Sequence, residues 1–387
     1  MGAFFNISQL NDCFGCGVCG VGCPTEAISM ARNDDGFFRP IVDNEKCIDC
    51  GRCLELCSLE NACNEGHNSP IRALSAWSKD ESTRSRSTSG GFIFELSRSL
   101  IGKGYKVLCV RFNCENNKAE YYIADNEEAL LAGVGSKYAQ ATRFEILKEF
   151  DFSRKYLIVA TPCTISSLRR YLPEAKRRNF VLVDFFCHGI PSYNLLDKYV
   201  ENVKKQIGVV SDFKFRCDDF GWQESTTIKA TGTAGTFLSP LSKGDAFFTM
   251  FLRDRCLAPC CYDSCRFKGL YSDADIRVGD FWGSKYSKSQ KGINAVLVLT
   301  PMGQKAFDEC NGIVVNNEET KDILSGQHSS RPNRAKSYDY VRNALKSQQS
   351  IDVIERNASV IDYIYGGYKE QIRRLFNKLK HATINNK

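Results

Sequence analysis

The sequence lacks the features that would place this chain in or across a membrane. No apolar run approaches the roughly 20 residues that a spanning helix needs. The segment Met1-Gly2-Ala3-Phe4-Phe5-Asn6 is not a charged region followed by an apolar one, so no secretory signal is expected. Membrane-spanning and secreted classes of protein are therefore excluded at this stage.

A concentrated basic surface is also lacking. The formal net charge is +7, but the excess of Lys and Arg is spread along the 387 residues, so nucleic acid is not an expected partner. The densest basic stretch is Lys369 to Lys387, where Ile372, Leu375, Phe376 and Leu379 recur at helical spacing. We expect a helix that docks one apolar stripe, with membrane-surface or partner binding as the alternative.

Cysteine, in contrast, is abundant, and eight of the nineteen cysteines form two regularly spaced runs. The runs are Cys13-x2-Cys16-x2-Cys19-x3-Cys23-Pro24 and Cys47-x2-Cys50-x2-Cys53-x3-Cys57. Three closely spaced thiolates can hold one 4Fe-4S cluster, while the displaced fourth reaches the other cluster. We therefore expect crossed ligation, with one cluster on Cys13, Cys16, Cys19 and Cys57 and the second on Cys47, Cys50, Cys53 and Cys23. A zinc site would leave one ligand over in each run.

Both runs resemble a bacterial two-cluster ferredoxin, including the turn glycines Gly15, Gly17 and Gly51. Ser58 stands where the usual pattern has proline, and Cys63 lies close by. Proline there mainly fixes a turn, so the ligand count is unaffected. A secreted protein with nineteen cysteines would be expected to form disulfides, whereas the cluster spacing indicates a reducing interior. We therefore expect a cytoplasmic protein.

The rest of the chain alternates strand-like and helical segments, which predicts an α/β domain with a partly parallel sheet. Expected strands are 105–110, 156–160 and 180–186, expected helices are 92–101, 145–150, 165–172 and 194–207, and later segments at 212–216, 225–230 and 295–299 suggest antiparallel strands. The expected fold class is thus α+β or α/β: a small bacterial-type module for two 4Fe-4S clusters over residues 1–63, fused to a larger mixed-sheet domain over 90–310. The polar stretch 64–89 is expected as a linker, and 311–387 as a basic helical extension.

Four short segments of the larger domain are candidates for ligand contacts. Ser87-Thr88-Ser89-Gly90-Gly91 precedes the helix that begins at Phe92, and is either a phosphate cradle or an ordinary serine-capped helix start. Gly135-Ser136-Lys137-Tyr138 suits a dinucleotide and equally a helix end. Thr161-Pro162-Cys163 and Cys187-His188-Gly189 each follow an apolar strand, so their cysteines are expected to meet at one sheet edge.

A second dense group of thiols comprises Cys256, Cys260, Cys261 and Cys265. These four form one metal site, or else Cys261 and Cys265 join Cys163 and Cys187 to hold a third 4Fe-4S cluster. Side chains of adjacent extended residues diverge, so Cys260 and Cys261 do not easily face one metal. The distributed third cluster is the preferred interpretation.

The order of the motifs resembles one family. The chain is similar to the beta subunits of coenzyme F420 hydrogenases and dehydrogenases over roughly residues 10–310. The motifs are Ser89-Gly90-Gly91, Gly135 to Tyr138, Thr161-Pro162-Cys163, Cys187-His188-Gly189, Phe215-Arg216 with Gly221-Trp222, Cys261-Tyr262 with Cys265, and Gly279-Asp280-Phe281-Trp282-Gly283.

The resemblance implies an iron-sulfur oxidoreductase with bound FAD, acting on a small-molecule substrate and exchanging electrons with ferredoxin or another redox protein. It implies flavin contacts from Ser89, Gly90, Gly91, Gly135, Ser136, Lys137, Tyr138, Thr161 and Pro162, and inner-cluster ligation by Cys163, Cys187, Cys261 and Cys265. His188 is a candidate proton donor, or else a hydrogen-bond partner of the cluster or backbone.

Departures from the family pattern restrict this inference. Cys217-Asp218 follow Phe215-Arg216 where a lysine is common, so use of the coenzyme F420 itself is not assumed.

Related bacterial sequences occur beside polysaccharide-assembly genes, which suggests a reductive step on a sugar or isoprenoid-type substrate. The alternatives are an electron-relay subunit without its own substrate and a non-catalytic cluster protein. Identical chains could also associate with one another.

Overall fold

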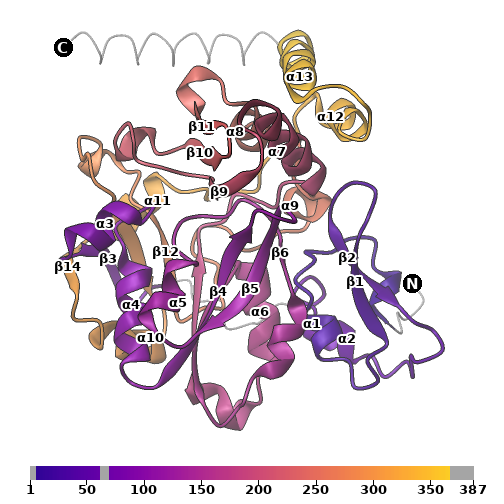
Figure 1. The fold of residues 1–387 in the computed structure, drawn as a ribbon. Coiled ribbons are helices and arrows are strands. Elements are labelled where there is room, and N and C mark those ends of the chain that lie inside the picture. Colours follow the sequence, from indigo (N-terminus) through magenta and orange to yellow (C-terminus); the bar gives the residue numbers. More distant parts are fainter. Residues whose placement is uncertain (1–5, 62–68, 367–387) are drawn as a thin grey trace.

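The computed structural model describes residues 6–61 and 69–366, which fold into a small N-terminal module beside a large mixed sheet (Figure 1). In the module, β1 (Ile28–Arg32) pairs antiparallel with β2 (Phe38–Val42). The short helices α1 (Val18–Val21) and α2 (Arg52–Leu56) begin directly after Gly17 and Gly51. Both glycines have positive φ, at 74° and 72°, which residues with a side chain rarely adopt.

The large domain is built on a sheet of nine strands. Their order is β14 (Ile313–Asn317), β3 (Arg72–Ser78), β13 (Asn294–Val298), β12 (Ile276–Asp280), β8 (Phe180–Phe185), β7 (Lys155–Val159), β4 (Tyr105–Asn113), β5 (Lys118–Ala124) and β6 (Ala141–Thr142). The four strands β4, β7, β8 and β12 run parallel to one another. Their carboxyl ends therefore meet at one edge, where open α/β sheets place their ligands.

Helices and a second sheet surround this core (Figure 1). The helices are α3 (Glu81–Arg86), α4 (Phe92–Ile101), α5 (Glu127–Leu131), α6 (Pro162–Tyr171), α7 (Tyr193–Ile207), α8 (Ala246–Leu252), α9 (Pro259–Asp263), α10 (Pro301–Asp308), α11 (Thr320–Ser325), α12 (Tyr338–Ala344) and α13 (Ile351–Tyr365). The second sheet has the order β11 (Gly235–Pro240), β10 (Thr227–Gly232) and β9 (Val210–Lys214), and is antiparallel. No helix in the described ranges has the length and apolar character needed to cross a membrane.

The mixed α/β class predicted from the sequence is confirmed, and the helix expected over 92–101 has those bounds. The expected linker over 64–89 is wrong from Arg72 onward, because β3 and α3 lie there. Its serines misled the prediction: Ser75 is buried in β3, where its hydroxyl bonds the side chains of Tyr286 and Glu318. The expected helical extension from residue 311 likewise begins with strand β14. The basic segment Lys369 to Lys387 and Cys63 lie outside the described residues.

The module is packed into the large domain. Val18, Val21 and Leu56 belong to the same buried cluster as the central strands. The Gln140 side chain donates to the carbonyls of Phe14 and Gly15 (3.2 and 3.1 Å). It also accepts from the Phe38 amide (2.8 Å). A Cβ at Gly15 would lie 1.8 Å from Gln140 Nε2, so a glycine is needed there for close approach as well as for the turn.

Deep in the sheet, Arg277 and Asp184 form a buried ion pair with two contacts of 2.7 Å. Replacing Asp184 by Asn would leave the Arg277 charge buried without its partner. We expect Asp184→Asn to lower the free energy of unfolding by about 3–5 kcal/mol, measured by chemical denaturation. As a control, Glu201→Gln removes the exposed pair with Lys205 and should change it by no more than about 1 kcal/mol. Equal effects of the two substitutions would contradict this account.

Candidate redox site

The Cys19 thiol lies near the three cysteines that crossed ligation assigns to its cluster, and near Cys53 of the other set as well. Cys19 is close enough to Cys16, Cys13 and Cys57 for each to raise the pKa of its thiol further, after burial. Burial, followed by Cys16, raises the pKa of Cys13 to about 12. Such buried thiols are neutral unless a cation replaces their protons, and a cluster supplies that charge. The grouping is consistent with the set Cys13, Cys16, Cys19 and Cys57, called here the near group.

The other four module cysteines form the outer group, Cys23, Cys47, Cys50 and Cys53. Cys50 is exposed, and the neighbouring Ile48 side chain is 65% exposed. Cys53 is buried, and Cys50 raises the pKa of its thiol after burial does. The outer group thus faces solvent, whereas the near group faces the large domain.

A third group forms at the carboxyl edge of the parallel strands. Cys163 begins α6 after β7, Cys187 follows β8, and Cys261 and Cys265 come from α9 and the loop after it. Burial, then Cys16, Cys187 and Cys265 raise the pKa of Cys163. Burial raises the pKa of Cys187 to about 12, with smaller effects of Cys261 and Cys265. The four residues proposed from the sequence as inner-cluster ligands, called here the inner group, therefore lie together.

The expected divergence of Cys260 and Cys261 is wrong, because both lie in helix α9 and their thiols contact each other, which raises the pKa of Cys260 and lowers that of Cys261. The Cys260 thiol donates to the Cys13 carbonyl (3.1 Å), whereas the Cys261 sulfur accepts from the Ile190 amide (3.4 Å). Across residues 6–61 and 69–366, no three Cys, His, Asp or Glu side chains are close enough to share a single metal ion. A zinc ion needs thiolates about 2.3 Å from one centre. This arrangement favours the distributed group over a zinc site within Cys256 to Cys265.

A cavity of about 810 Å³ adjoins these cysteines. Its wall includes Cys16 of the near group and Cys187 of the inner group. Of the flavin contacts implied by the resemblance, Ser89, Gly91, Gly135, Ser136, Lys137, Tyr138 and Thr161 line it, and so does His188. Gly90 and Pro162 are not part of the wall. A Cβ at Gly90 would lie 2.7 Å from the Ala76 carbonyl oxygen, so this glycine is needed for packing against β3.

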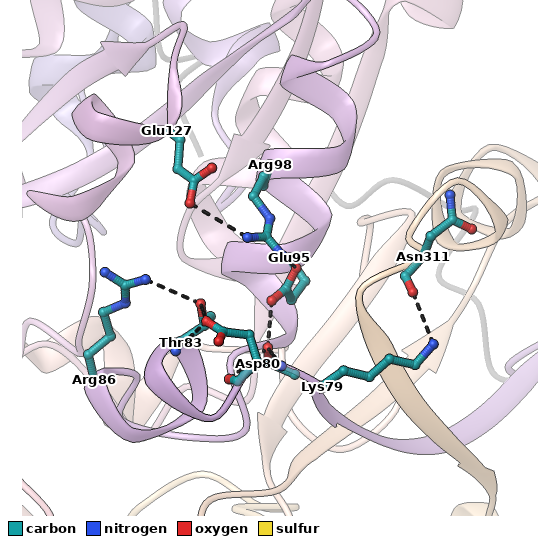
Figure 2. A network of polar contacts seen from close by, with 9 residues as sticks. Lys79, Asp80, Thr83, Arg86, Glu95, Arg98, Glu127 and Asn311 are labelled. Atoms are coloured by element: carbon teal, nitrogen blue, oxygen red, sulfur yellow. Dashed lines mark hydrogen bonds and ion pairs between the residues drawn. The ribbon is translucent and has the colours of Figure 1, made fainter.

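A polar network links residues of helices α3 and α4, which flank the serine-glycine turn in the sequence (Figure 2). Asp80 caps α3 by accepting from the amide and hydroxyl of Thr83. Buried Glu95 on α4 accepts from Ser78 (2.5 Å) and pairs with Arg98. Gly91 has a φ of 83° and begins α4 without a side-chain cap. The Phe92 amide is not free for a phosphate, because it donates to Asn294 Oδ1 (3.0 Å).

The Lys137 side chain bonds the backbone of its own turn. Its ammonium donates to the carbonyls of Gly133, Val134 and Gly135 (2.7, 2.9 and 2.9 Å). Burial lowers the pKa of Lys137 to about 8. The amide of Ser136 donates to Thr88 Oγ1 (3.1 Å), which ties this turn to the serine-glycine turn. The two candidate flavin segments are therefore one continuous wall.

Sequence reasoning did not assign a role to Arg216, which is buried in the cavity wall. Its guanidinium pairs with Asp280 (2.7 Å), and Asp280 accepts from Ser89 (2.5 Å). Arg216 Nε is buried and has no hydrogen-bond partner in the described part of the chain. The only earlier indication was the position of the two motifs, Phe215-Arg216 and Gly279-Asp280.

His188 lies beside a second histidine that sequence reasoning did not select. The two Nδ1 atoms of His188 and His328 are 3.3 Å apart. His188 Nε2 is 3.2 Å from the Phe251 carbonyl oxygen and 2.8 Å from Asp254 Oδ1. At a separation of 3.3 Å, one Nδ1 carries a proton and the other accepts it. Both histidines line the cavity, so this proton lies at its wall.

Comparisons with known proteins identify the family of this chain. The N-terminal part of the coenzyme F420 hydrogenase/dehydrogenase beta subunit matches residues 73–148, its C-terminal part matches 153–323, and a 4Fe-4S dicluster domain matches 12–61. The chain belongs to this beta subunit family. It is accordingly an iron-sulfur redox protein of the F420 hydrogenase/dehydrogenase type, as the sequence predicted.

Similarity beyond the family is distant. No curated protein matches the sequence. Among solved structures, a chain in the xenon-derivatised F420-reducing NiFe hydrogenase complex from Methanosarcina barkeri is 16% identical, with a TM-score of 0.46. That similarity covers 67% of the present chain and 90% of the other.

Crossed ligation predicts which cluster each cysteine supports. Replacing Cys57 by Ala should remove the cluster of the near group and leave that of the outer group, because three thiolates remain on the first and four on the second. Electron paramagnetic resonance of the reduced protein distinguishes the two clusters. Cys310→Ala, which removes a buried thiol outside all three groups, is the control. Loss of the outer cluster in Cys57→Ala would refute the assignment.

The inner group predicts a third cluster. Three 4Fe-4S clusters require about twelve irons per chain and two require about eight. Anaerobic iron and sulfide analysis should give the higher value, and Cys187→Ala should reduce it by about four irons. A value near eight in the intact protein with full flavin occupancy would rule out the third cluster. Zinc in the same elemental analysis would revive the alternative site at Cys256 to Cys265.

Proposed function

We propose that this chain is an iron-sulfur flavoprotein oxidoreductase that binds FAD in the 810 Å³ cavity. One observation carries the proposal. The serine-glycine turn, the Gly135 to Tyr138 turn, Cys16 and Cys187 border the same cavity, although they come from separate parts of the sequence. A cofactor held by those turns would adjoin two cysteine groups at once.

The residues of the wall fit a flavin nucleotide. The cavity volume is in the upper part of the usual range for ligand pockets, about 300–1,000 Å³. The buried Arg216 Nε is an unused donor, which a carbonyl or phosphate oxygen would satisfy. Ser89, Ser136 and Thr161 supply further hydroxyl or amide groups, and Tyr138 packs its ring against Phe248 and Phe251. This mixture of apolar surface and few polar groups is typical of cofactor sites.

When bound, FAD supplies both two-electron exchange with an organic substrate and one-electron exchange with clusters. The protein's part is to hold the cysteine groups against the cavity and to exclude water from it. The Gly91 and Gly135 turns shape the wall, and pairing with Asp280 fixes the Arg216 guanidinium beside it. Cys16 connects the cavity to the near group, and Cys50 places the outer group at the surface.

His188 is the proposed proton donor to the substrate. Its Nε2 is turned towards the Phe251 carbonyl and Asp254, and its Nδ1 towards His328. A proton held between the two Nδ1 atoms lies at the cavity wall and can be replaced from the exposed ring of His328. Asp254 Oδ1, 2.8 Å from Nε2, is placed to orient the imidazole.

Ferredoxin or another one-electron carrier is the proposed partner at the outer group, and the proposed substrate is a small organic molecule, with a precursor of a polysaccharide as one source. The cytoplasm is the proposed location, since a reducing interior preserves the clusters. Asp218 stands where the family often has a cation, so F420 itself is not the proposed substrate.

The second candidate function is that of an electron-relay subunit, which the surface position of Cys50 also suits. Substrate turnover by the isolated chain separates the two.

Filling the cavity should displace the flavin. Ser136→Trp places a large ring in the wall between the two turns, so we expect FAD affinity to fall by at least tenfold. The measurement is flavin content and fluorescence titration after anaerobic reconstitution. Ser85→Trp makes the same change at an exposed position of α3 outside the cavity wall, and should bind FAD normally. A cluster-replete intact protein that holds no flavin would refute the proposal and favour the relay.

A further inference from the structure

One buried side chain of the large domain contacts a sulfur of the module. Ser167 lies on α6 and is fully buried. Its Oγ is 3.6 Å from Cys16 Sγ and 3.2 Å from the Ser58 amide nitrogen, which donates to it. Other side-chain contacts to module sulfurs, from Asn6, Thr25 and Asp49, arise within the module itself. In the described ranges, the contact of Ser167 is the one that crosses from the large domain.

The direction of this hydrogen bond depends on the state of Cys16. A thiol donates its own proton to the hydroxyl, whereas a cysteine bound to iron is a thiolate and has none to give. A serine hydroxyl has one rotatable proton and two acceptor lone pairs. With the Ser58 amide occupying one lone pair, the hydroxyl proton remains available for the Cys16 sulfur.

We propose that the Ser167 hydroxyl donates to the Cys16 thiolate and thereby raises the reduction potential of the cluster nearest the cavity. The inference rests on the proposed ligation of the near group. A reduced cluster carries one more negative charge than the oxidised one, and part of it resides on the cysteine sulfurs. A hydrogen-bond donor at sulfur stabilises the reduced state more, which makes the cluster easier to reduce. Ser167 is thus a positioning residue that acts on potential, not on substrate.

The position of Ser167 indicates in which direction its effect on the reduction potential would drive electrons. Cys163, which begins the same helix, belongs to the inner group, and it lies near enough to Cys16 to be affected by its charge. Within residues 6–61 and 69–366, the side-chain hydrogen bonds to outer-group sulfurs come from the module itself and not from the large domain. The Ser167 hydrogen bond therefore acts on the potential of the near cluster alone, and this contribution favours electron flow from the exposed cluster towards the cavity.

The chain offers a matched control one residue away. Ser166 is also fully buried on α6, but its hydroxyl has no hydrogen-bond partner in the described structure. The experiment is a redox titration of the anaerobically purified full chain, monitored by electron paramagnetic resonance. In Ser167→Ala the midpoint potential of the near cluster should become more negative while that of the outer cluster stays unchanged. Ser166→Ala should change neither, and Ser167→Thr, which keeps a hydroxyl, should restore the wild-type value.

Several outcomes would overturn the inference. Ser167→Ala with full iron content and an unchanged potential would do so, even if its melting temperature fell, because a purely structural role predicts that result. If Ser167→Ala assembles too little cluster to titrate, wild-type protein exchanged into deuterium oxide decides. Its reduced near cluster should then show an exchangeable proton besides those of the Gly15, Cys16, Val18, Leu59 and Glu60 amides, and its absence would refute the donor role. Failure of wild type itself to show two module clusters would instead refute the proposed ligation.

Discussion

The junction between the module and the large sheet is the constraint on which the site depends. Electron transfer requires the cofactors to be close, and the chain achieves this by burying part of the module in the core of the large domain. Val18, Val21 and Leu56 pack with the central strands, and the Gln140 amide satisfies three backbone groups of the module. Because these contacts fix Cys16 beside the cavity, the geometry of the cavity cannot be separated from that of the near group.

The second organising feature is the parallel arrangement of β4, β7, β8 and β12. Residues that follow three of these strands, Cys163, Cys187 and Trp282, come from distant parts of the sequence and still meet at one edge. Parallel strands make this convergence automatic, since each presents its carboxyl end to the same side. The meeting of the inner group at this edge is thus a consequence of topology, and the antiparallel strands β5 and β13 add Tyr121 and Asn294 to the cavity wall.

Local spacing explains what the sequence made predictable. The two cysteine runs, the helix over 92–101 and the meeting of Cys163 with Cys187 all follow from regular periods or from strand-end rules. What escaped prediction is non-local. The Arg216–Asp280–Ser89 chain joins three distant segments, and no single segment has an unusual composition. Strand β3 was missed because buried serines, satisfied by Tyr286 and Glu318, resemble a polar linker. The segment Gly135 to Tyr138 was expected to suit a dinucleotide or a helix end, but the Lys137 ammonium donates to three carbonyls of its own turn.

The glycines of the module have a consequence for how such proteins can be recombined. A Cβ at Gly15 would meet Gln140 at 1.8 Å, and one at Gly17 would meet the Phe144 ring at 2.1 Å. The module surface is therefore shaped to side chains that belong to the large domain. A ferredoxin-type unit transplanted from another protein could keep all eight cysteines and still fail to seat here, unless it also carried small residues at these two positions. Exchange of the module as a cassette is limited by steric fit at the junction and not by the cluster ligands.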